Sequence, residues 1–265
     1  MSVQPADRAA IDEAVTSAQS LDYAERWMRD SLDILRPAFS VQQITVDMTA
    51  AMTRLDDFRR RKVAATPTHL LIQAAARTLA RNPDLHQLIA GTRRERPAHV
   101  DIGLSVTGEI FVAPVLVIES AELKSVEDIV TEVGTRTAEV QKADREMLER
   151  LRGWGRLVPF AFLRRAMLRS MFASPTRRRK VAGTFQVSVV PADWALSSAF
   201  VATGVLIAGA VRARVVAFEG QCVVRPTMTL TLSADHGAWD GKAATRFLAG
   251  VRSELEAAFS VEASQ

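Results

Sequence analysis

One histidine and one aspartate near the C-terminal end of the chain have the types and the spacing of residues that do chemistry. His236 follows an alternating run that predicts a strand, with Met228, Leu230 and Leu232 toward one face. Asp240 stands four residues later, where a helical pattern begins. A neutral imidazole at a strand end can accept a proton near pH 7. The pair alone also fits a plain interpretation, in which Asp240 caps the helix and His236 is a polar turn residue.

The residues around this pair favour chemistry. The run SADHGAWDGKAATRFL resembles the HxxxDG signature of the dihydrolipoyl acyltransferase catalytic domain of 2-oxoacid dehydrogenase complexes. Other segments resemble that family in the same order: ITVDMTAAMTRLDDFR, THLLIQAAARTLARNPDL, DIGLSVTGEIFVAPVLVIESAELKSVEDI, GTFQVS and VVRPTMTLTLSADH. The similar segments cover roughly residues 40–140 and 183–259. HxxxDG alone is weaker, because it also occurs in chloramphenicol acetyltransferase and in peptide-synthetase condensation domains.

The resemblance implies an acyltransferase in which His236 is the general base. In the family this histidine takes a proton from a thiol, of dihydrolipoamide or coenzyme A, and the thiolate attacks an acyl thioester. Such assistance is typically worth ~10²–10⁴ in rate. Ser188, the last residue of GTFQVS, matches the family's donor to the oxyanion. Asp240 matches an aspartate that pairs with an arginine of the N-terminal region, for which Arg26 and Arg29 are the candidates.

The resemblance also implies the partners. The family forms trimers with the active site between subunits, which would place the His236 and Ser188 of one site on different chains. Coenzyme A or acyl-CoA is expected as a substrate, without a metal and without a lipoyl group on this chain. The acceptor would be a small-molecule or carrier-bound thiol, amine or hydroxyl. The polar end ELEAAFSVEASQ lacks the apolar segment that joins trimers into larger cores, so we expect a free homotrimer.

Two departures from the family favour a different class of function. Gly237 stands where the family has an arginine after the histidine, and SVVPADW follows where the family has S-N-L-G. The alternative is a non-catalytic trimeric scaffold or partner-binding platform.

A third departure is the basic stretch RLRGWGRLVPFAFLRRAMLRSMFASPTRRRK, residues 150–180, which contains no acidic residue. Apolar residues recur there at helical spacing with arginines on the flank: Phe160, Leu163, Met167 and Met171, with Arg164, Arg165 and Arg169. The interpretations left open are a structural helix, peripheral contact with a membrane, a channel for a long acyl chain, and arginines for coenzyme A phosphates. Nucleic acid binding is disfavoured, because interleaved aromatic residues are missing.

Composition sets the broad class. The chain has 265 residues, 48% of them apolar, and a net charge of +4, which suits one large domain that folds without metal or disulfides. Its single cysteine, Cys222, cannot form an internal disulfide, and the N-terminus does not look like a secretory signal. We therefore expect a cytoplasmic protein. The uncharged segment 194–211 is interpreted as a loop and a buried strand rather than a membrane span.

Hydrophobic periodicity predicts the elements. Helices are expected over 5–37, 48–61, 125–151 and 241–259, and a further helix is expected to begin at Thr66 or Thr68. Strands are expected over 40–49, 183–190, 205–218 and 222–233. Residues 99–106 and 110–118 are expected to form a hairpin. The fold class is α/β (α+β), a chloramphenicol acetyltransferase-like mixed sheet covered by helices, in one domain. Residues 1–39 are expected to be a helical arm. Residues 40–265 are the expected acyltransferase catalytic domain, with a basic amphipathic insert at about 145–182.

Overall fold

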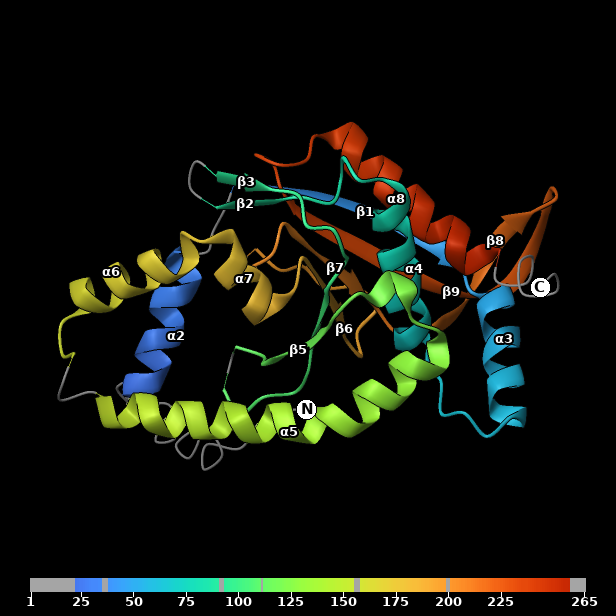
Figure 1. Ribbon diagram of the computed structural model, residues 1–265. Helices are drawn as coiled ribbons and strands as arrows, with labels where there is room; N and C mark the ends of the chain where they lie inside the picture. The colour runs from blue at the N-terminus through green and yellow to red at the C-terminus, as the bar shows by residue number, and fades with distance from the viewer. Residues whose placement is uncertain are drawn as a thin grey trace, which may run out of the picture.

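A computed structural model describes residues 22–34, 38–90, 93–110, 112–154, 158–198 and 201–257 (Figure 1). The helices are α2 Tyr23–Ile34, α3 Thr49–Arg60, α4 Pro67–Arg81, α5 Val126–Gly153, α6 Ala161–Phe172, α7 Pro175–Ala182 and α8 Gly241–Glu256. The strands of the main sheet are β1 Phe39–Asp47, β4 Ile102–Ser105, β5 Val115–Ile118, β6 Phe185–Val189, β7 Gly204–Ala208, β8 Arg212–Phe218 and β9 Gln221–Asp235. A small separate ladder pairs β2 Leu88–Ala90 with β3 Arg93–Glu95.

The main sheet is mixed, with the order β1-β9-β7-β6-β4-β5, and β8 extends it by pairing with the first half of β9. Strands β4, β6 and β7 run parallel, while β9 runs antiparallel to its neighbours β1, β7 and β8. The expected mixed sheet covered by helices is therefore present. Side chains of paired residues share a face, so the register fixes which residues are neighbours on each side.

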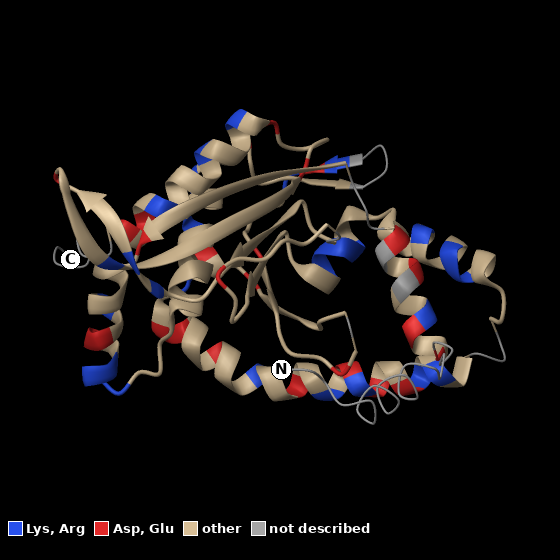
Figure 2. Ribbon diagram, turned by 180° about the vertical axis from the view of Figure 1, so that it is seen from behind, with Lys and Arg blue, Asp and Glu red and all other residues tan. Residues whose placement is uncertain are grey.

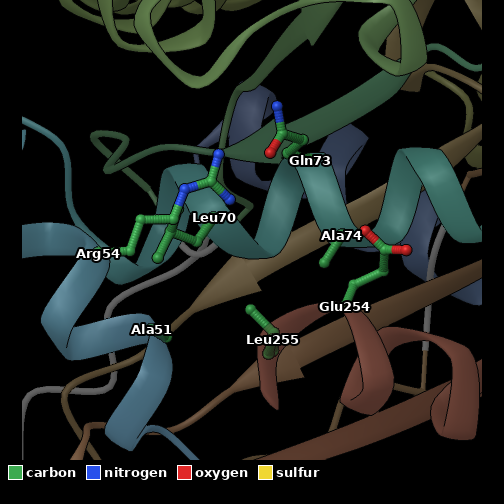
Figure 3. A pocket seen from close by; sticks show the side chains of 7 residues that line it. All are labelled: Ala51, Arg54, Leu70, Gln73, Ala74, Glu254 and Leu255. Carbon is green, nitrogen blue, oxygen red and sulfur yellow. The ribbon is translucent and has the colours of Figure 1, made fainter. Parts of the chain in front are cut away.

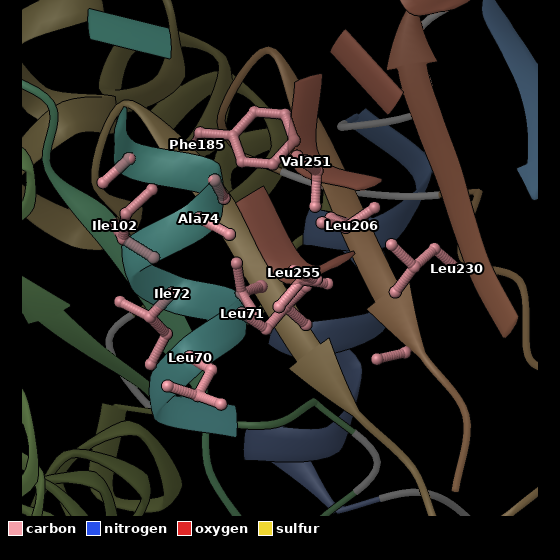
Figure 4. Packing of buried hydrophobic residues seen from close by; sticks show 14 of the residues in the cluster. Leu70, Leu71, Ile72, Ala74, Ile102, Phe185, Leu206, Leu230, Val251 and Leu255 are labelled. Atoms are coloured by element: carbon pink, nitrogen blue, oxygen red, sulfur yellow. The ribbon is translucent and has the colours of Figure 1, made fainter. Parts of the chain in front are cut away.

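Helices α4 and α8 cover one face of the sheet and form the main core with it (Figures 1 and 4). Leu71 of α4 and Val251 of α8 are fully buried against Leu206 and Leu230 of the central strands. The alternation along β9 places its leucines on this face and its threonines on the other. Between α3, α4 and α8 only a small hollow remains, of about 10 Å³ (Figure 3). It has room for about one water molecule, so it is a packing gap rather than a ligand site.

Helices α2 and α6 pack against each other at one end of the molecule and form a second, smaller core (Figure 1). Its buried members are Tyr23 and Trp27 of α2 with Leu168 and Phe172 of α6. After α7 the chain passes directly beside the start of β4. Gly183 has φ +72°, and a Cβ there would lie 2.4 Å from the carbonyl oxygen of Asp101, so only glycine fits this approach.

Two predicted strands differ from the observed ones. The predicted strand 205–218 divides into β7 and β8, because the chain turns at Gly209, which approaches the Asp193 carbonyl too closely for any side chain. The hairpin of β4 and β5 is present, but β5 begins only after Pro114, since proline has no N–H for the ladder.

The remaining expectations concern the ends of the chain and the uncharged segment. The helix predicted over 5–37 is described only as α2, and its earlier part lies outside the described residues, as do the last residues of the final helix. The division into an arm and a catalytic domain stays a prediction. In segment 194–211 the described residues form a loop and then the buried strand β7. Among the described helices, none has the length and apolarity to cross a membrane.

Candidate active site

His236 lies in the turn that follows β9, and two hydrogen bonds hold it. Its backbone N–H donates to the carbonyl of Ala38 at 2.7 Å, which ties the turn to the start of β1. The ring Nδ1 lies 3.1 Å from the carbonyl oxygen of Trp239. A carbonyl only accepts, so Nδ1 carries the proton in the neutral ring and Nε2 is left with its lone pair. The side chain is exposed, so this nitrogen is open to a substrate.

Trp239 is the anchor of this turn. Its indole N–H donates to the carbonyl of Leu85 at 2.8 Å, and its ring is 1% exposed. The ring stacks on Phe185 of β6 at 5.8 Å between centroids and packs against Phe247 of α8. A buried aromatic side chain with its N–H satisfied is a rigid support. The carbonyl that orients His236 is therefore fixed by the main core.

Asp240 is the N-cap of α8, where it accepts a hydrogen bond from the backbone N–H of Ala243 at 2.7 Å. The expected ion pair with Arg26 is not formed in the described part of the chain. Arg26 instead donates to the carbonyl of Asp22, and its guanidinium lies over the Tyr23 ring. The side chain of Arg29 lies outside the described residues.

Ser188 is at the end of β6, and its hydroxyl makes no hydrogen bond to any residue that the structure describes. It pairs with Ile207, which pairs with Thr231 of β9. His236 is five residues beyond Thr231, so the two candidates are about 17 Å apart along the strands and about 10 Å apart across them. A single described chain does not bring them together.

The face of the sheet that carries Ser188 is the one opposite α4 and α8. The register places Phe39 and Val41 of β1 on this face, where they are 39% and 43% exposed. At the centre of this face Ile207 and Thr231 are buried, so the exposed apolar side chains lie at its β1 edge. Exposed apolar side chains at such an edge mark a surface that a further subunit could cover.

His236 lines a hollow of about 460 Å³. Asp84, Lys242 and Arg246 line it, and Arg246 is ion-paired with Asp84. Lys242 makes no ion pair within the described residues. Its ammonium group therefore gives one free positive charge beside the histidine.

Arg178 of α7 is a residue near the site that the sequence interpretation missed. Its Nε donates to the Phe172 carbonyl at 2.7 Å and its Nη1 to the Ile89 carbonyl at 3.2 Å. Burial lowers the pKa of Arg178, and the negative charge of Asp235, just before the histidine, opposes that shift. The insert thus brings a cation near the turn that contains Gly237. No sequence signal links the two positions, because they meet only through the tertiary fold.

The predicted basic amphipathic helix is present as α6, but one assignment on it was wrong. Arg164 was expected on the flank and is instead 4% exposed, with its Nε 3.0 Å from Asp30 of α2. The helix turns Leu168 and Arg164 inward, while Leu163 and Met167 are 40% and 44% exposed. The inward face is set by the second core and not by the apolar stripe that the sequence displays.

The structure is a mixed sheet covered by helices, with the His236 turn at the end of β9, and comparisons with known proteins indicate the family that it resembles. Residues 201–261 match the family described as 2-oxoacid dehydrogenases acyltransferase (catalytic domain). The matched segment contains His236 and Asp240 but not Ser188. The resemblance predicted from the sequence is thereby confirmed. No match was found among curated proteins.

Solved structures of the same fold cover nearly the whole chain. A probable dihydrolipoamide acetyltransferase from Listeria monocytogenes has a TM-score of 0.69 at 19% identity, over 95% of this chain and 99% of that one. A dihydrolipoamide acetyltransferase from Azotobacter vinelandii has 0.69 at 18%, over 97% of each chain. The cubic core of a pyruvate dehydrogenase multienzyme complex has 0.64 at 19%, over 97% of each. These TM-scores show that the chain shares their fold, and the fold class predicted from the sequence is confirmed.

In the described part of the chain, no group of three His, Cys, Asp or Glu side chains is placed to hold a metal ion.

Proposed function

We propose that this protein is an acyltransferase that moves an acyl group between a thioester and a thiol, amine or hydroxyl acceptor. The observation that carries the proposal is the hydrogen bond from His236 Nδ1 to the Trp239 carbonyl, which leaves Nε2 as an exposed base. Acyl-CoA is the proposed donor, and the acceptor is a small molecule or is attached to a carrier.

The chemistry begins with proton transfer. With a thiol acceptor, His236 Nε2 takes the S–H proton and the thiolate attacks the thioester carbonyl. The C–O double bond opens to an oxyanion, to which the Ser188 hydroxyl donates. The intermediate then collapses, the C–S bond to the donor breaks, and the imidazolium returns its proton to the departing thiolate. No net oxidation or reduction occurs.

Ser188 can serve this His236 only from a second copy of the chain. A separation of about 17 Å along the strands is too long for one protomer to supply both groups. The exposed side chains of Phe39 and Val41, at the β1 edge of the face that carries Ser188, support a contact with another copy. We propose a homotrimer in which the histidine turn of one protomer faces Ser188 of the next. The site would then be closed by the association itself.

The Azotobacter structure offers support for these roles. It comes from work on one serine, one histidine and one asparagine in the catalytic mechanism of that enzyme, the last two being four residues apart. His236 and Asp240 have the same spacing here. Asp240 differs from that asparagine by its charge, and its N-cap contact needs only the oxygen that both side chains have.

We propose that coenzyme A binds in the hollow beside His236. The free ammonium of Lys242 and the guanidinium of Arg246 line it, and such groups bind phosphate oxygens. No group on this chain is proposed to carry a lipoyl arm. We propose that the reaction takes place in the cytoplasm, where acyl-CoA is available.

The test is acyl transfer from a panel of acyl-CoAs to dihydrolipoamide and to amine acceptors, followed by release of free coenzyme A. Replacing His236 by Ala should lower turnover by ~10²–10⁴. His99→Ala is the matched control, because His99 is an exposed histidine that pairs with Glu122 away from the turn. Turnover in His236→Ala equal to that of the His99→Ala variant would contradict the assignment.

A second candidate is a non-catalytic trimeric scaffold, favoured by Gly237 and by the altered segment after Ser188. Binding of coenzyme A separates the two. A ligand at about 100 times its dissociation constant stabilises the folded protein by about 2.7 kcal/mol. A clear rise in Tm with coenzyme A supports the enzyme, whereas no shift up to millimolar ligand favours the scaffold.

A further inference from the structure

The outward side of α6 is an apolar surface that the described part of the chain does not cover. Phe162 is 67% exposed, Leu163 40% and Met167 44%, and Phe160, just before the helix, is 59% exposed. The rings of Phe160 and Phe162 stack at 5.7 Å. These four side chains are called the α6 outer face below. Clustered large apolar side chains on a surface helix mark a contact with another molecule or with lipid.

The opposite side of α6 is fixed, so the outer face cannot turn inward. Leu168 and Phe172 are buried against α2, and Arg164 is held at 3.0 Å from Asp30 inside that contact. Rotating the helix to bury Phe162 would expose these residues and leave Asp30 buried without its partner, which is costly. The outer face is therefore a permanent feature of the protomer.

The charge beside this face is mainly positive, although Asp33 of α2 pairs with Arg165. From Arg150 to Ala192 the chain contains no Asp or Glu, and Figure 2 shows α6 with basic residues only. Arg169 on α6, and Arg177 and Lys180 on the helix that follows, make no ion pair in the described part of the chain. An apolar helix face with unneutralised cations beside it is typical of a helix that lies on an anionic bilayer.

A second copy of the chain is the other occupant to consider. The copy required by the separation of Ser188 and His236 must reach the end of β6, whereas α6 packs mainly on α2 and α7. The free cations next to the outer face would also need acidic partners on that copy. The positive charge and the aromatic side chains together favour lipid.

We propose that the α6 outer face inserts shallowly into the interface of an anionic lipid bilayer and holds the protein at the membrane surface. The phenylalanines and Met167 enter the boundary between headgroups and acyl chains. Arg169 and the cations of α7 stay at the level of the lipid phosphates. The protein is then peripheral and released by salt, since no described helix spans a membrane.

The experiment is co-sedimentation of the full chain with vesicles of phosphatidylcholine containing about a third phosphatidylglycerol, and with phosphatidylcholine alone. We expect binding to the anionic vesicles only, weakened as salt rises from about 0.1 to about 1 M and the Debye length falls from about 10 to about 3 Å. The double variant Phe162→Gln Met167→Gln should bind at least tenfold more weakly, and Arg169→Glu likewise. Controls are Leu123→Gln, a 73% exposed leucine elsewhere, and Arg60→Glu on α3.

Two outcomes would overturn the proposal. One is failure of the unmodified protein to bind anionic vesicles at low salt. The other is equal loss of vesicle binding in the Leu123→Gln and double variants, since the α6 outer face would then have no special role. If the unmodified protein does not bind vesicles and the double variant changes the oligomeric state, the α6 outer face is an interface between copies of the chain. Vesicle binding is measured without acyl transfer, so the result is independent of the proposed function.

Discussion

His236 and Trp239 form one unit, because the Nδ1 atom of the histidine lies 3.1 Å from the carbonyl oxygen of the tryptophan. The tryptophan ring is buried between Phe185 and Phe247, so the acceptor cannot follow the histidine if its ring turns. The core of the protein thus determines which imidazole nitrogen faces the substrate.

This relationship predicts the tautomer of the neutral ring. At a pH where His236 is neutral, its proton should be on Nδ1, because the carbonyl oxygen of Trp239 cannot donate. Long-range proton–nitrogen NMR spectra of the histidine rings, with His236→Gln to assign the signal, report the position of that proton. A neutral His236 protonated on Nε2 would mean that the base is not available in the orientation described.

Ser188 is predicted to act through its hydroxyl alone. Since that hydroxyl makes no hydrogen bond within the described chain, Ser188→Ala should leave the unfolding midpoint nearly unchanged while lowering turnover by ~10²–10³, the usual effect of losing one oxyanion donor. Ser188→Thr keeps a hydroxyl and should retain more activity. Equal turnover in the Ala variant and the unmodified enzyme would remove Ser188 from the site.

Much of the site was predictable from the sequence because it depends on local signals. The alternation of β9 ends at Asp235, and Asp240 is a normal N-cap for the apolar stripe of α8, so the position of His236 in a turn followed from spacing. The helix expected from Thr66 or Thr68 is α4, with Thr66 as its N-cap.

The parts that could not be predicted depend on contacts between distant segments. Trp239 orients the histidine only because the fold brings Leu85 and Phe185 to it. Arg164 looked like a surface residue of a basic helix, and only the position of Asp30 on α2 explains its burial. Hydrophobic periodicity in the sequence indicates that a helix has an apolar and a polar face. It does not indicate which neighbouring element covers each face.

The ion pair of Arg164 with Asp30 gives a stability prediction. Both side chains are nearly buried, 5% and 7% exposed, so Arg164→Met leaves an aspartate with only the half-exposed Arg165 as its partner. Removing one member of a buried pair typically costs ~3–5 kcal/mol. Because α2 and α6 have a core of their own, we expect the loss first as faster hydrogen exchange in residues 23–34 and 161–172.

The matched control for that pair is Arg165→Met, since Arg165 is 45% exposed and approaches the same Asp30 at 2.9 Å. A surface partner of this kind contributes at most about 1 kcal/mol. Equal exchange rates in the Arg164→Met and Arg165→Met variants would show that the inner ion pair does not hold α2 against α6.

His69 makes the stability of α4 depend on pH. Its Nδ1 accepts the backbone N–H of Thr66 at 3.0 Å in a capping box, and burial lowers the pKa of His69 below the ordinary value of 6.5. The unfolded chain therefore binds a proton on His69 more readily than the folded chain does. As a result, the free energy of unfolding rises with pH in the window just below 6.5, and this contribution of His69 is lost when the pH falls through that window.

Replacing His69 by Gln should remove this dependence while keeping an acceptor at the third position of the helix. If the unfolded state binds one proton more than the folded state, the free energy of unfolding changes by about 1.4 kcal/mol per pH unit. We expect urea unfolding of His69→Gln to show a smaller slope between about pH 5 and 6.5. A residual slope is expected from His86, whose pKa burial also lowers; an unchanged slope would contradict the role of His69.

The central claim, that each active site combines His236 of one protomer with Ser188 of another, is tested most directly by mixing inactive chains. His236→Ala and Ser188→Ala protomers, tagged differently and co-expressed, should each be nearly inactive alone. Random mixing in a closed trimer pairs an intact histidine with an intact serine at about a quarter of the sites, so about a quarter of the unmodified turnover should return. Co-assembly, checked by both tags, without any recovery of acyl transfer would contradict a shared site.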